Sequence, residues 1–438
     1  MLTKAFKAYD IRGIYPTELD EETAYKIGRA TAQFLKAKLM MVGRDSRLSS
    51  PALKKSLVYG ITDQGCDVVD IGLCNTPMSY YAAQKMHAMM ITASHNPKEY
   101  NGIKITREGP EQLGEKNGLK NIEKLAVACH FPDPKKRGTL KTKDILPEYT
   151  KYVRKLVNGK YKPLRVLIDC GNGMAGHVVP ELLKGLPIKY KLLYGKIDFN
   201  FPNHVPNPAE PENTEELQHE VVKGKYDLGI AYDADCDRVM FIDEKGRRIP
   251  SAFSLILFTQ HIAKKGEKMV YTVNMSRIVK EKVQEAGVKP CPSMIGHTEV
   301  PLVMKKVNGV TSGELTGHFY FKKFSYSDSG DIAALYMLSI LSRSGKKMSQ
   351  LIKPFEKYAT SEEINYKVAD KMASMKRVED AYKKQIVDRL DGISVDTGDY
   401  WFNVRLSKTE NFVRLNCEAT SKKKLNQAIE WLSKIIQG

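Results

Sequence analysis

Apolar residues recur at two spacings along the first part of the chain. Residues 21–35 carry apolar side chains at helical spacing, and Asp20 before them is typical of a helix N-cap. The apolar run 39–43 has the length of a buried strand. Pro51 opens a second helical pattern, and Gly65 fits its C-terminal end. This stretch therefore predicts helix, strand and helix in succession.

The same alternation continues as far as an unusual loop. Residues 66–71 are typical of a strand, a short helix is expected near 78–86, and residues 88–92 form another apolar strand pattern. A β-α-β-α-β succession predicts a largely parallel sheet. Ser94 follows the last of these strands, and ligands bind just past the carboxyl ends of strands in such sheets.

The pattern restarts twice and then changes. A second α/β unit is indicated by a strand at 164–169, a helix to about residue 184 and a strand at 227–232. A third unit begins near Pro250. It contains a helix at 251–264, a strand at 268–273, a helix from Ser276 and the loop segments SMIGHTE and SGELTGH. From about residue 360 the pattern indicates a small α+β module, with strands at 364–368, around 393–406 and at 411–419, a long polar helix and a C-terminal helix. The turn LSKTEN lies between two of its strands.

Composition sets the scale and the class of protein. The 438 residues correspond to about three domains of roughly 150 residues, or four smaller ones. Hydrophobic residues make up 42% and charged residues 27%, which is ordinary for a folded protein with several cores. The 7 cysteines include no CxxC pair, which argues for a reducing compartment and against disulfides or a zinc-thiolate site. No signal-like segment or run of about 18 apolar residues occurs, so we expect a cytoplasmic protein without membrane association.

The chain is basic, with 69 Lys and Arg against 51 Asp and Glu and a net charge of +18. Such a balance can indicate nucleic acid, an acidic membrane surface or anionic small substrates. The excess is spread along the chain, and its densest clusters resemble a linker at 134–143 and a solvated helix face at 421–426. No zinc finger, RNP-type strand or basic heptad region accompanies the charge, so no nucleic-acid partner is expected.

The loop DADCDR places Asp233, Asp235 and Asp237 at alternate positions, with small residues between them. Three hard oxygen donors this close can hold a divalent cation, although an acidic surface turn has the same composition. An EF-hand fits less well, because Arg238 stands where that loop needs glycine and the flanking residues are strand-like. A magnesium-type site is the preferred interpretation, since Mg²⁺ is usually held by a few carboxylates and a phosphate oxygen.

Ser94 has several possible roles in isolation. TASHN lacks the glycines of a hydrolase nucleophile elbow, and His95 is too close in sequence to be a comfortable general base. Serine before a turn is also a common helix cap. A metal loop at the end of another parallel strand favours a phosphorylated serine, whose charge of about −1.5 to −2 a magnesium ion neutralises during transfer.

The unusual loops together resemble a known family. TASHNPKEYNGIK, DADCDR, GELTGH and RLSKTEN occur in the order, and at roughly the spacing, of the four signature loops of the α-D-phosphohexomutases. AYDIRG and FPNHVPNPAEPENT are similar to the phosphomannomutase/phosphoglucomutase branch. The resemblance covers essentially the whole chain. It implies three α/β modules with mixed, largely parallel sheets plus a C-terminal α+β module around a central cleft, with boundaries at 1–145, 146–246, 247–356 and 357–438.

The resemblance also implies an activity and its residues. It implies a reversible isomerase that moves phosphate between C1 and C6 of mannose or glucose through a hexose 1,6-bisphosphate, which also serves as activator. Ser94 matches the phosphoserine, and the resemblance implies one Mg²⁺ per chain, held by a phosphoserine oxygen with Asp233, Asp235 and Asp237. The other matching positions comprise catalytic residues Arg12, His95, Lys104, Arg238 and His318, and substrate-binding residues His297, Glu314, Thr316, His318, Arg405, Ser407, Lys408 and Thr409.

The chain departs from the family pattern at several positions, and the departure at Asn274 weakens any inference about the preferred sugar. Ala234 and Cys236 stand where the metal loop usually has glycine, and Lys408 and Asn411 replace usual residues of the phosphate loop. Asn274 stands where the branch often carries a sugar-contacting lysine, whereas GHT at 296–298 is nearer the glucose/mannose branch than phosphoglucosamine mutases. A phosphoglucosamine mutase and a metal-dependent phosphatase remain the alternatives. The expected partner is a phosphosugar, and the expected state is a monomer or small homo-oligomer.

Overall fold

The computed structural model describes residues 2–407 and 411–438, which separate into two compact units. The first unit comprises Met1–Ile249 and Thr316–Met348, and the second comprises Pro250–Leu315 and Ser349–Gly438. The four expected domain boundaries stay a prediction, because two compact units do not test four domain boundaries.

The first unit opens with a sheet in the order β1-β5-β4-β2-β3-β7, with β6 paired to β5. The pairs β2–β3 and β2–β4 are parallel, as the β-α-β-α-β pattern predicts, whereas β4–β5 and β5–β1 are antiparallel. The chain therefore turns back after the carboxyl end of β4, and β5 runs antiparallel beside it. The strands are β1 (Ile11–Ile14), β2 (Leu39–Arg44), β3 (Asp67–Leu73), β4 (His87–Ile91), β5 (Tyr100–Arg107), β6 (Glu111–Gln112) and β7 (Leu140–Thr142).

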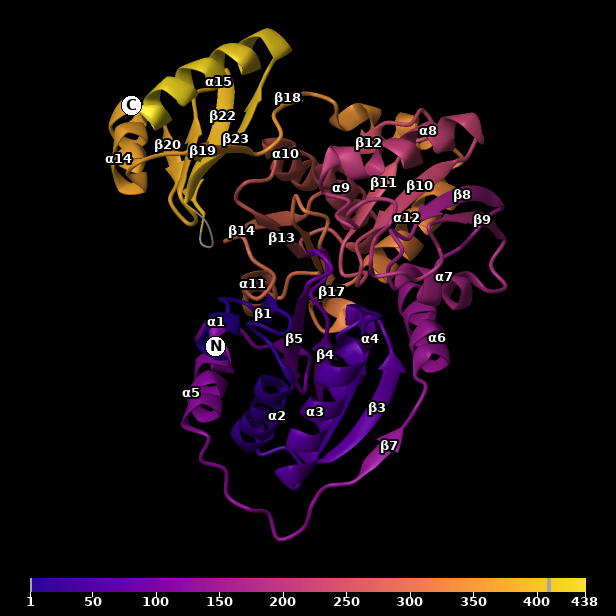
Figure 1. Cartoon of the computed structure of the whole chain (residues 1–438). Helices are drawn as coiled ribbons and strands as arrows, with labels where there is room; N and C mark the ends of the chain where they lie inside the picture. The colour runs from indigo at the N-terminus through magenta and orange to yellow at the C-terminus, as the bar shows by residue number, and fades with distance from the viewer. Residues whose placement is uncertain (1, 408–410) are drawn as a thin grey trace. The chain divides into compact units, whose positions relative to one another are not determined.

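Helices α2 (Glu21–Leu35) and α3 (Ser50–Asp63) lie side by side against this sheet (Figure 1). The Asp20 side chain accepts a hydrogen bond from the Thr23 amide and so caps α2, as expected. Gly60 allows the two helices to approach closely, because a Cβ at this position would lie only 2.1 Å from the carbonyl oxygen of Tyr25. The remaining helices here are α1 (Leu2–Ala5), α4 (Thr76–Ala82), the turn Glu115–Leu119 and α5 (Lys120–Ala128).

One expectation for this region is wrong. The basic segment 134–143 is not only a linker, because its end forms β7, which pairs in parallel with β3. All three residues of β7 are exposed, so the strand lacks the alternation that marks a half-buried strand. Its backbone hydrogen bonds to β3 hold it at the sheet edge.

The second sheet of the first unit has the order β12-β11-β10-β8-β9, with β8 parallel to both β9 and β10. Leu217 and Val221 of α8 pack on Leu167, Ala231 and Ile242 of its strands. The elements are α6 (Leu146–Val157), β8 (Leu164–Asp169), α7 (Ala175–Leu183), β9 (Ile188–Leu193), Pro211–Thr214, α8 (Glu215–Lys223), β10 (Leu228–Tyr232), β11 (Val239–Ile242), β12 (Arg248–Ile249), β16 (Phe319–Phe321), Lys322–Phe324, β17 (Ser327–Asp328) and α12 (Gly330–Ser344).

The second unit begins with a parallel strand pair, β13–β14, and helices around it. The segment SMIGHTE begins with Ser293, the last residue of β14. It is a loop from Met294 to Thr298, and its last residue, Glu299, begins a helix. The elements are α9 (Ser251–Ile262), β13 (Lys268–Thr272), α10 (Arg277–Glu285), β14 (Lys289–Ser293), α11 (Glu299–Val307) and β15 (Thr311–Gly313), followed by α13 (Met348–Ile352), which starts at the boundary between the units, and Lys353–Phe355.

The C-terminal part of the second unit is an antiparallel sheet in the order β18-β23-β22-β21-β20, with β19 also paired to β23. Helix α15, yellow in Figure 1, lies along this sheet and buries Leu425 and Leu432 in its core. This is the expected α+β module. Its elements are β18 (Ala359–Thr360), β19 (Ile364–Lys367), α14 (Lys371–Tyr382), β20 (Ile386–Asp388), β21 (Ile393–Asp396), β22 (Tyr400–Leu406), β23 (Phe412–Ala419) and α15 (Lys422–Gln437).

Across the described residues, every helix is too short or too polar to cross a bilayer.

Candidate active site

Ser94 lies three residues beyond β4, in a buried turn, as expected from the strand pattern. Its φ is +48°, a left-handed conformation that is uncommon for a residue other than glycine. The Ser94 hydroxyl donates a hydrogen bond to Asp233 Oδ2 at 2.8 Å and lies 3.2 Å from His95 Nδ1. The serine oxygen is thus held between an acidic loop and an imidazole.

The acidic loop follows β10 directly and leads into β11. Asp233, Asp235 and Asp237 are all buried, and a ligand atom from each lies within 4.8 Å of the others. Cys236 has a φ of +62°, so it adopts the left-handed backbone that a glycine usually provides. The loop therefore brings its carboxylates together despite its non-glycine spacers.

The triad fits a divalent cation. Asp235 Oδ1 and Asp237 Oδ1 are buried and have no hydrogen-bond partner among the described residues, so each offers a lone pair. Burial, and then repulsion from Asp237 and Asp235, raise the pKa of Asp233 well above its usual value. A dication would relieve this repulsion, and hard oxygen donors are the ligands that magnesium and calcium ions bind.

Lys104, on β5, balances part of the triad's charge. Its Nζ lies 2.8 Å from Asp235 Oδ2 and 2.6 Å from Asp237 Oδ2. Burial alone would lower the pKa of Lys104, but the two carboxylates outweigh burial and raise it. Thr76, the first residue of α4, donates its hydroxyl to Asp235 Oδ2 at 2.5 Å and its amide to the Asp235 carbonyl at 2.9 Å. These bonds fix which oxygens of Asp235 are left free.

Two arginines lie beside the serine and metal loops. Arg238 Nε is 3.2 Å from Asp233 Oδ2, and its Nη1 donates to Asn207 Oδ1 at 3.1 Å. Arg12 donates from Nη1 to Asn96 Oδ1, in the serine loop, at 2.6 Å. Arg238 Nη2 and Arg12 Nε are buried without a hydrogen-bond partner among the described residues. Guanidinium N–H groups of this kind suit a phosphate oxygen.

The two histidines of the site differ in their surroundings. Burial, and then the positive charge of Arg238 and Arg12, lower the pKa of His95 well below its usual value. His95 is therefore neutral at physiological pH, with its Nδ1 facing the serine hydroxyl.

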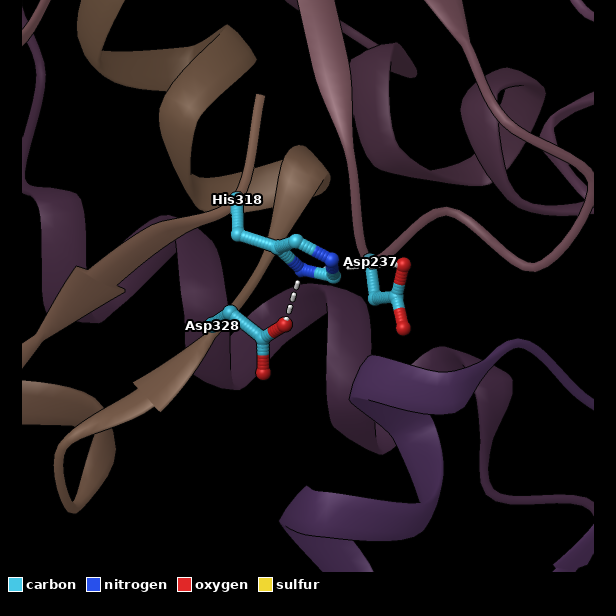
Figure 2. A group of neighbouring side chains, drawn as sticks. All are labelled: Asp237, His318 and Asp328. Atoms are coloured by element: carbon cyan, nitrogen blue, oxygen red, sulfur yellow. Dashed lines mark hydrogen bonds and ion pairs between the residues drawn. The ribbon is translucent and has the colours of Figure 1, made fainter. Parts of the chain in front are cut away.

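His318 forms a pair with Asp328, which Figure 2 shows together with Asp237. His318 Nδ1 lies 2.5 Å from Asp328 Oδ2 and 3.8 Å from Asp237 Oδ1. A backbone bridge between Arg238 and His318 joins the second half of SGELTGH to the metal loop. A carboxylate on Nδ1 fixes the ring orientation and assigns the proton to that nitrogen, so Nε2 is the unprotonated ring nitrogen.

Most of the remaining predicted residues lie in the second unit. Thr316 is in the first unit and exposed, whereas His297, Glu314, Arg405 and Ser407 are in the second unit. Glu314 is buried just after β15. Arg405 Nη2 pairs with Glu363 at 2.8 Å, and the Ser407 amide donates a hydrogen bond to the Phe412 carbonyl. Lys408 and Thr409 lie outside the described residues.

Sequence reasoning missed three residues that contact this cluster, namely Thr76, Asp328 and Arg47. Arg47 is fully buried and binds the backbone of the Ser94 loop. It follows the carboxyl end of the strand pattern at 39–43, so the rule that identified Ser94 also pointed to it. Asp328 carried no comparable signal, because it lies in a loop-like stretch 10 residues after His318.

Four domain models of one protein family match successive parts of the chain. Residues 3–130, 147–246 and 251–358 match the phosphoglucomutase/phosphomannomutase alpha/beta/alpha domains I, II and III, and residues 363–431 match the C-terminal domain of that family. A phosphomannomutase of Escherichia coli K12 is 37% identical and covers 94% of both chains. A phosphomannomutase of Vibrio cholerae is 37% identical and covers 99% of this chain and 98% of its own.

Solved structures show the same fold. A phosphoglucomutase/phosphomannomutase family protein of Burkholderia thailandensis superposes with a TM-score of 0.90 at 29% identity, over 99% of this chain and 96% of its own. Two crystal structures of Aspergillus fumigatus N-acetylphosphoglucosamine mutase are 13% identical, with TM-scores of 0.61 and 0.64, and show the fold alone. One is a serine-to-alanine variant in complex with glucose 1,6-bisphosphate, and the other is a complex with GlcNAc-6P and magnesium.

Proposed function

We propose, from the premise that this chain belongs to the phosphoglucomutase/phosphomannomutase family, that Ser94 carries the phosphoryl group during its reaction. The chain is a phosphohexomutase, an isomerase of hexose phosphates. The observation that carries the serine assignment is the hydrogen bond from the Ser94 hydroxyl to Asp233, which sets the oxygen against the metal-binding triad.

The metal is magnesium in this proposal, one ion per chain. Asp233, Asp235 and Asp237 hold it, together with an oxygen of phosphorylated Ser94. The buried, unpaired Oδ1 atoms of Asp235 and Asp237 support this assignment, and a magnesium complex of a distant fungal mutase is consistent with it. When bound, the ion supplies positive charge that stabilises the transferring phosphoryl group. Lys104 neutralises the excess charge of Asp235 and Asp237 and keeps them ionised.

The residues of the chain supply the remaining chemistry. In the first half-reaction a sugar hydroxyl attacks the phosphorus, a new P–O bond forms on the sugar, and the P–O bond to Ser94 breaks. The departing Ser94 oxygen takes up a proton, which regenerates the hydroxyl that donates to Asp233. His318 Nε2 accepts the hydroxyl proton, and Asp328 stabilises the imidazolium through Nδ1. Arg238 and Arg12 bind the equatorial phosphate oxygens through their unsatisfied N–H groups. The second half-reaction runs these steps in reverse, with the other phosphate of the bisphosphate returned to Ser94.

Substrate recognition belongs to the second unit and to Thr316 in this proposal. Arg405 and Ser407, with Lys408 and Thr409 of the same loop, bind the phosphate that is not transferred. Arg405 Nε is buried without a hydrogen-bond partner among the described residues, which supports an anion there. Glu314, Thr316 and His297 contact the sugar. Hexose 1,6-bisphosphate is the activator because it can phosphorylate Ser94 from either end.

The preferred sugar is mannose or glucose, and one experiment tests both the sugar and the reaction class. Purified enzyme with Mg²⁺ and a trace of 1,6-bisphosphate is given mannose 1-phosphate and glucose 1-phosphate in parallel, with glucosamine 1-phosphate as the competing substrate. We expect the 6-phosphate of mannose or glucose, at a rate that depends on the bisphosphate. Preference for the glucosamine substrate would correct the sugar assignment. Release of inorganic phosphate in place of isomerisation would identify a phosphatase.

A further inference from the structure

A fully buried arginine holds the backbone of the Ser94 loop. The Arg47 side chain has 0% exposure, and its guanidinium donates to four backbone carbonyls of one loop. The distances are 2.6 Å to the carbonyl oxygen of Ser94, 2.7 Å to Asn96, 2.8 Å to Pro97 and 3.0 Å to Tyr100. Four carbonyl dipoles that converge on one point repel one another unless a cation lies there. The curl of residues 94–100 therefore depends on this guanidinium.

Three further groups fix Arg47 in place. Asp45 Oδ2 lies 3.3 Å from Arg47 Nε, while Asp45 Oδ1 accepts hydrogen bonds from the Arg47 amide and the Ser50 hydroxyl. Phe199 and Phe201 contact the guanidinium with ring centroids 5.6 and 5.5 Å from its central carbon. The two rings come from a segment that follows β9, so residues from three separate stretches of the first unit meet at Arg47.

The first and shortest of these bonds ends on Ser94 itself. Ser94 adopts a φ of +48°, a strained left-handed conformation that persists only when the surroundings impose it. The Arg47 bond to the Ser94 carbonyl and the Ser94 amide bond to the Thr92 hydroxyl hold the residue on both sides. That conformation points the hydroxyl at Asp233.

We propose that Arg47 is a positioning residue for phosphoryl transfer, which sets the backbone of the 94–100 loop so that the Ser94 oxygen faces the triad. This inference rests on the proposed role of Ser94 as the phosphoryl carrier. Arg47 does not touch the substrate; it acts through the loop carbonyls. A lysine there keeps the charge but lacks the planar fork that reaches four carbonyls, so the fork is the feature that matters.

The test compares Arg47→Lys with Arg44→Lys. Arg44 is the matched control, since its guanidinium is half-buried nearby and donates to the Asp45 carbonyl outside the Ser94 loop. Each protein is phosphorylated with glucose 1,6-bisphosphate, and the transfer rate to glucose 1-phosphate is measured in a single turnover, with KM and the thermal midpoint recorded alongside. We expect transfer in Arg47→Lys to slow about a hundredfold with little change in KM, and the control to match wild type.

The outcomes separate the two proposals. Transfer at the wild-type rate in folded Arg47→Lys overturns the positioning role, whereas wild type that carries no phosphate on Ser94 overturns the phosphoserine assignment. If Arg47→Lys does not fold, Asp45→Asn replaces it, because that change removes only the charge opposite Arg47 Nε. Slowed transfer in folded Asp45→Asn then supports the proposal, and an unchanged rate contradicts it.

Discussion

The Ser94 hydroxyl donates a hydrogen bond to Asp233 Oδ2 at 2.8 Å, although the two residues are 139 positions apart. One follows β4 of the first sheet and the other follows β10 of the second sheet. Both strands have parallel neighbours, and their carboxyl ends deliver the two loops to one place. Phosphoryl transfer needs such a meeting of nucleophile and metal ligands, because its catalysis is mainly positioning and charge stabilisation.

Asp235→Asn is expected to weaken metal binding and turnover together. The Asp235 carboxylate accepts from Thr76 and Lys104 on Oδ2 and offers Oδ1 to the cation, so an amide loses charge and misplaces one donor. We expect the Mg²⁺ concentration for half-maximal activity to rise at least about tenfold. Asp133→Asn, at a carboxylate that is 99% exposed, is the control. Full activity of the wild type after removal of metal by EDTA would refute the metal assignment.

His318→Gln tests proton transfer. Glutamine keeps a polar side chain but cannot accept and release a proton, so kcat should fall by about 10²–10⁴-fold while phosphorylation of Ser94 is still detected. Asp328→Asn should give a smaller loss, since it removes the charge that stabilises the imidazolium. His219→Gln, on the exposed face of α8, serves as the control. A wild-type kcat in His318→Gln would show that another group accepts the proton of the sugar hydroxyl.

Asp331, at the start of α12, makes stability depend on pH. Burial raises the pKa of Asp331 from 3.8 to about 6, although Tyr149 and Asn75 donate hydrogen bonds to it. The folded state therefore binds the proton more tightly than the unfolded state, and stability falls as pH rises through 3.8 to about 6. Above that range the cost is about 3 kcal/mol, and roughly half of it develops between pH 5 and 7.5.

Asp331→Asn should remove this dependence. We expect the thermal midpoint of the variant, relative to wild type, to rise between pH 5 and pH 7.5, because the amide has no charge to bury. Differential scanning calorimetry at both pH values gives the comparison. A midpoint difference that is the same at the two pH values would show that Asp331 ionises without cost.

Arg405→Ala tests binding of the phosphate that is not transferred. In the proposed function this site accepts the 1-phosphate in one half-reaction and the 6-phosphate in the other. We therefore expect kcat/KM to fall in both directions, by an amount that corresponds to about 2–4 kcal/mol of lost transition-state stabilisation. The fold should survive, since Glu363 keeps its ion pair with Arg414 at 3.1 Å. Arg389→Ala, at a half-exposed arginine of the same module, is the control. Unchanged kcat/KM for hexose 1-phosphates would show that RLSKTEN is an ordinary hairpin turn.

The sequence predicts the amphipathic and strongly apolar elements closely. The helix expected at 21–35 and the strand expected at 164–169 have those bounds in the structure, because periodicity and caps mark both. Helix α12 gave no such signal, since it is buried nearly throughout and so lacks a polar face. Strand β7 gave no signal for the opposite reason, because its residues are all exposed and its backbone pairs with β3 at the sheet edge.

The candidate site was predictable where residues act through sequence motifs. Ser94 and the aspartates of the metal loop follow strands and form recognisable patterns. Arg47 follows a strand end as Ser94 does, but the sequence does not reveal its role, because its partners are main-chain carbonyls of another loop. The His318–Asp328 pair depends on how a β-hairpin places two distant side chains, and spacing alone does not give that.

The central claim is that Ser94 carries the transferred phosphate, and the most direct measurement tracks that phosphate. Wild type, Ser94→Ala and the control Ser56→Ala are incubated with glucose 1,6-bisphosphate and Mg²⁺, and peptide mass spectrometry locates the phosphate before and after a chase with hexose 1-phosphate. We predict one phosphoryl group on the peptide containing Ser94 in wild type and control, lost to the sugar as bisphosphate during the chase, and neither label nor turnover in folded Ser94→Ala. Turnover in Ser94→Ala, or a phosphate that leaves as inorganic phosphate, would contradict the account.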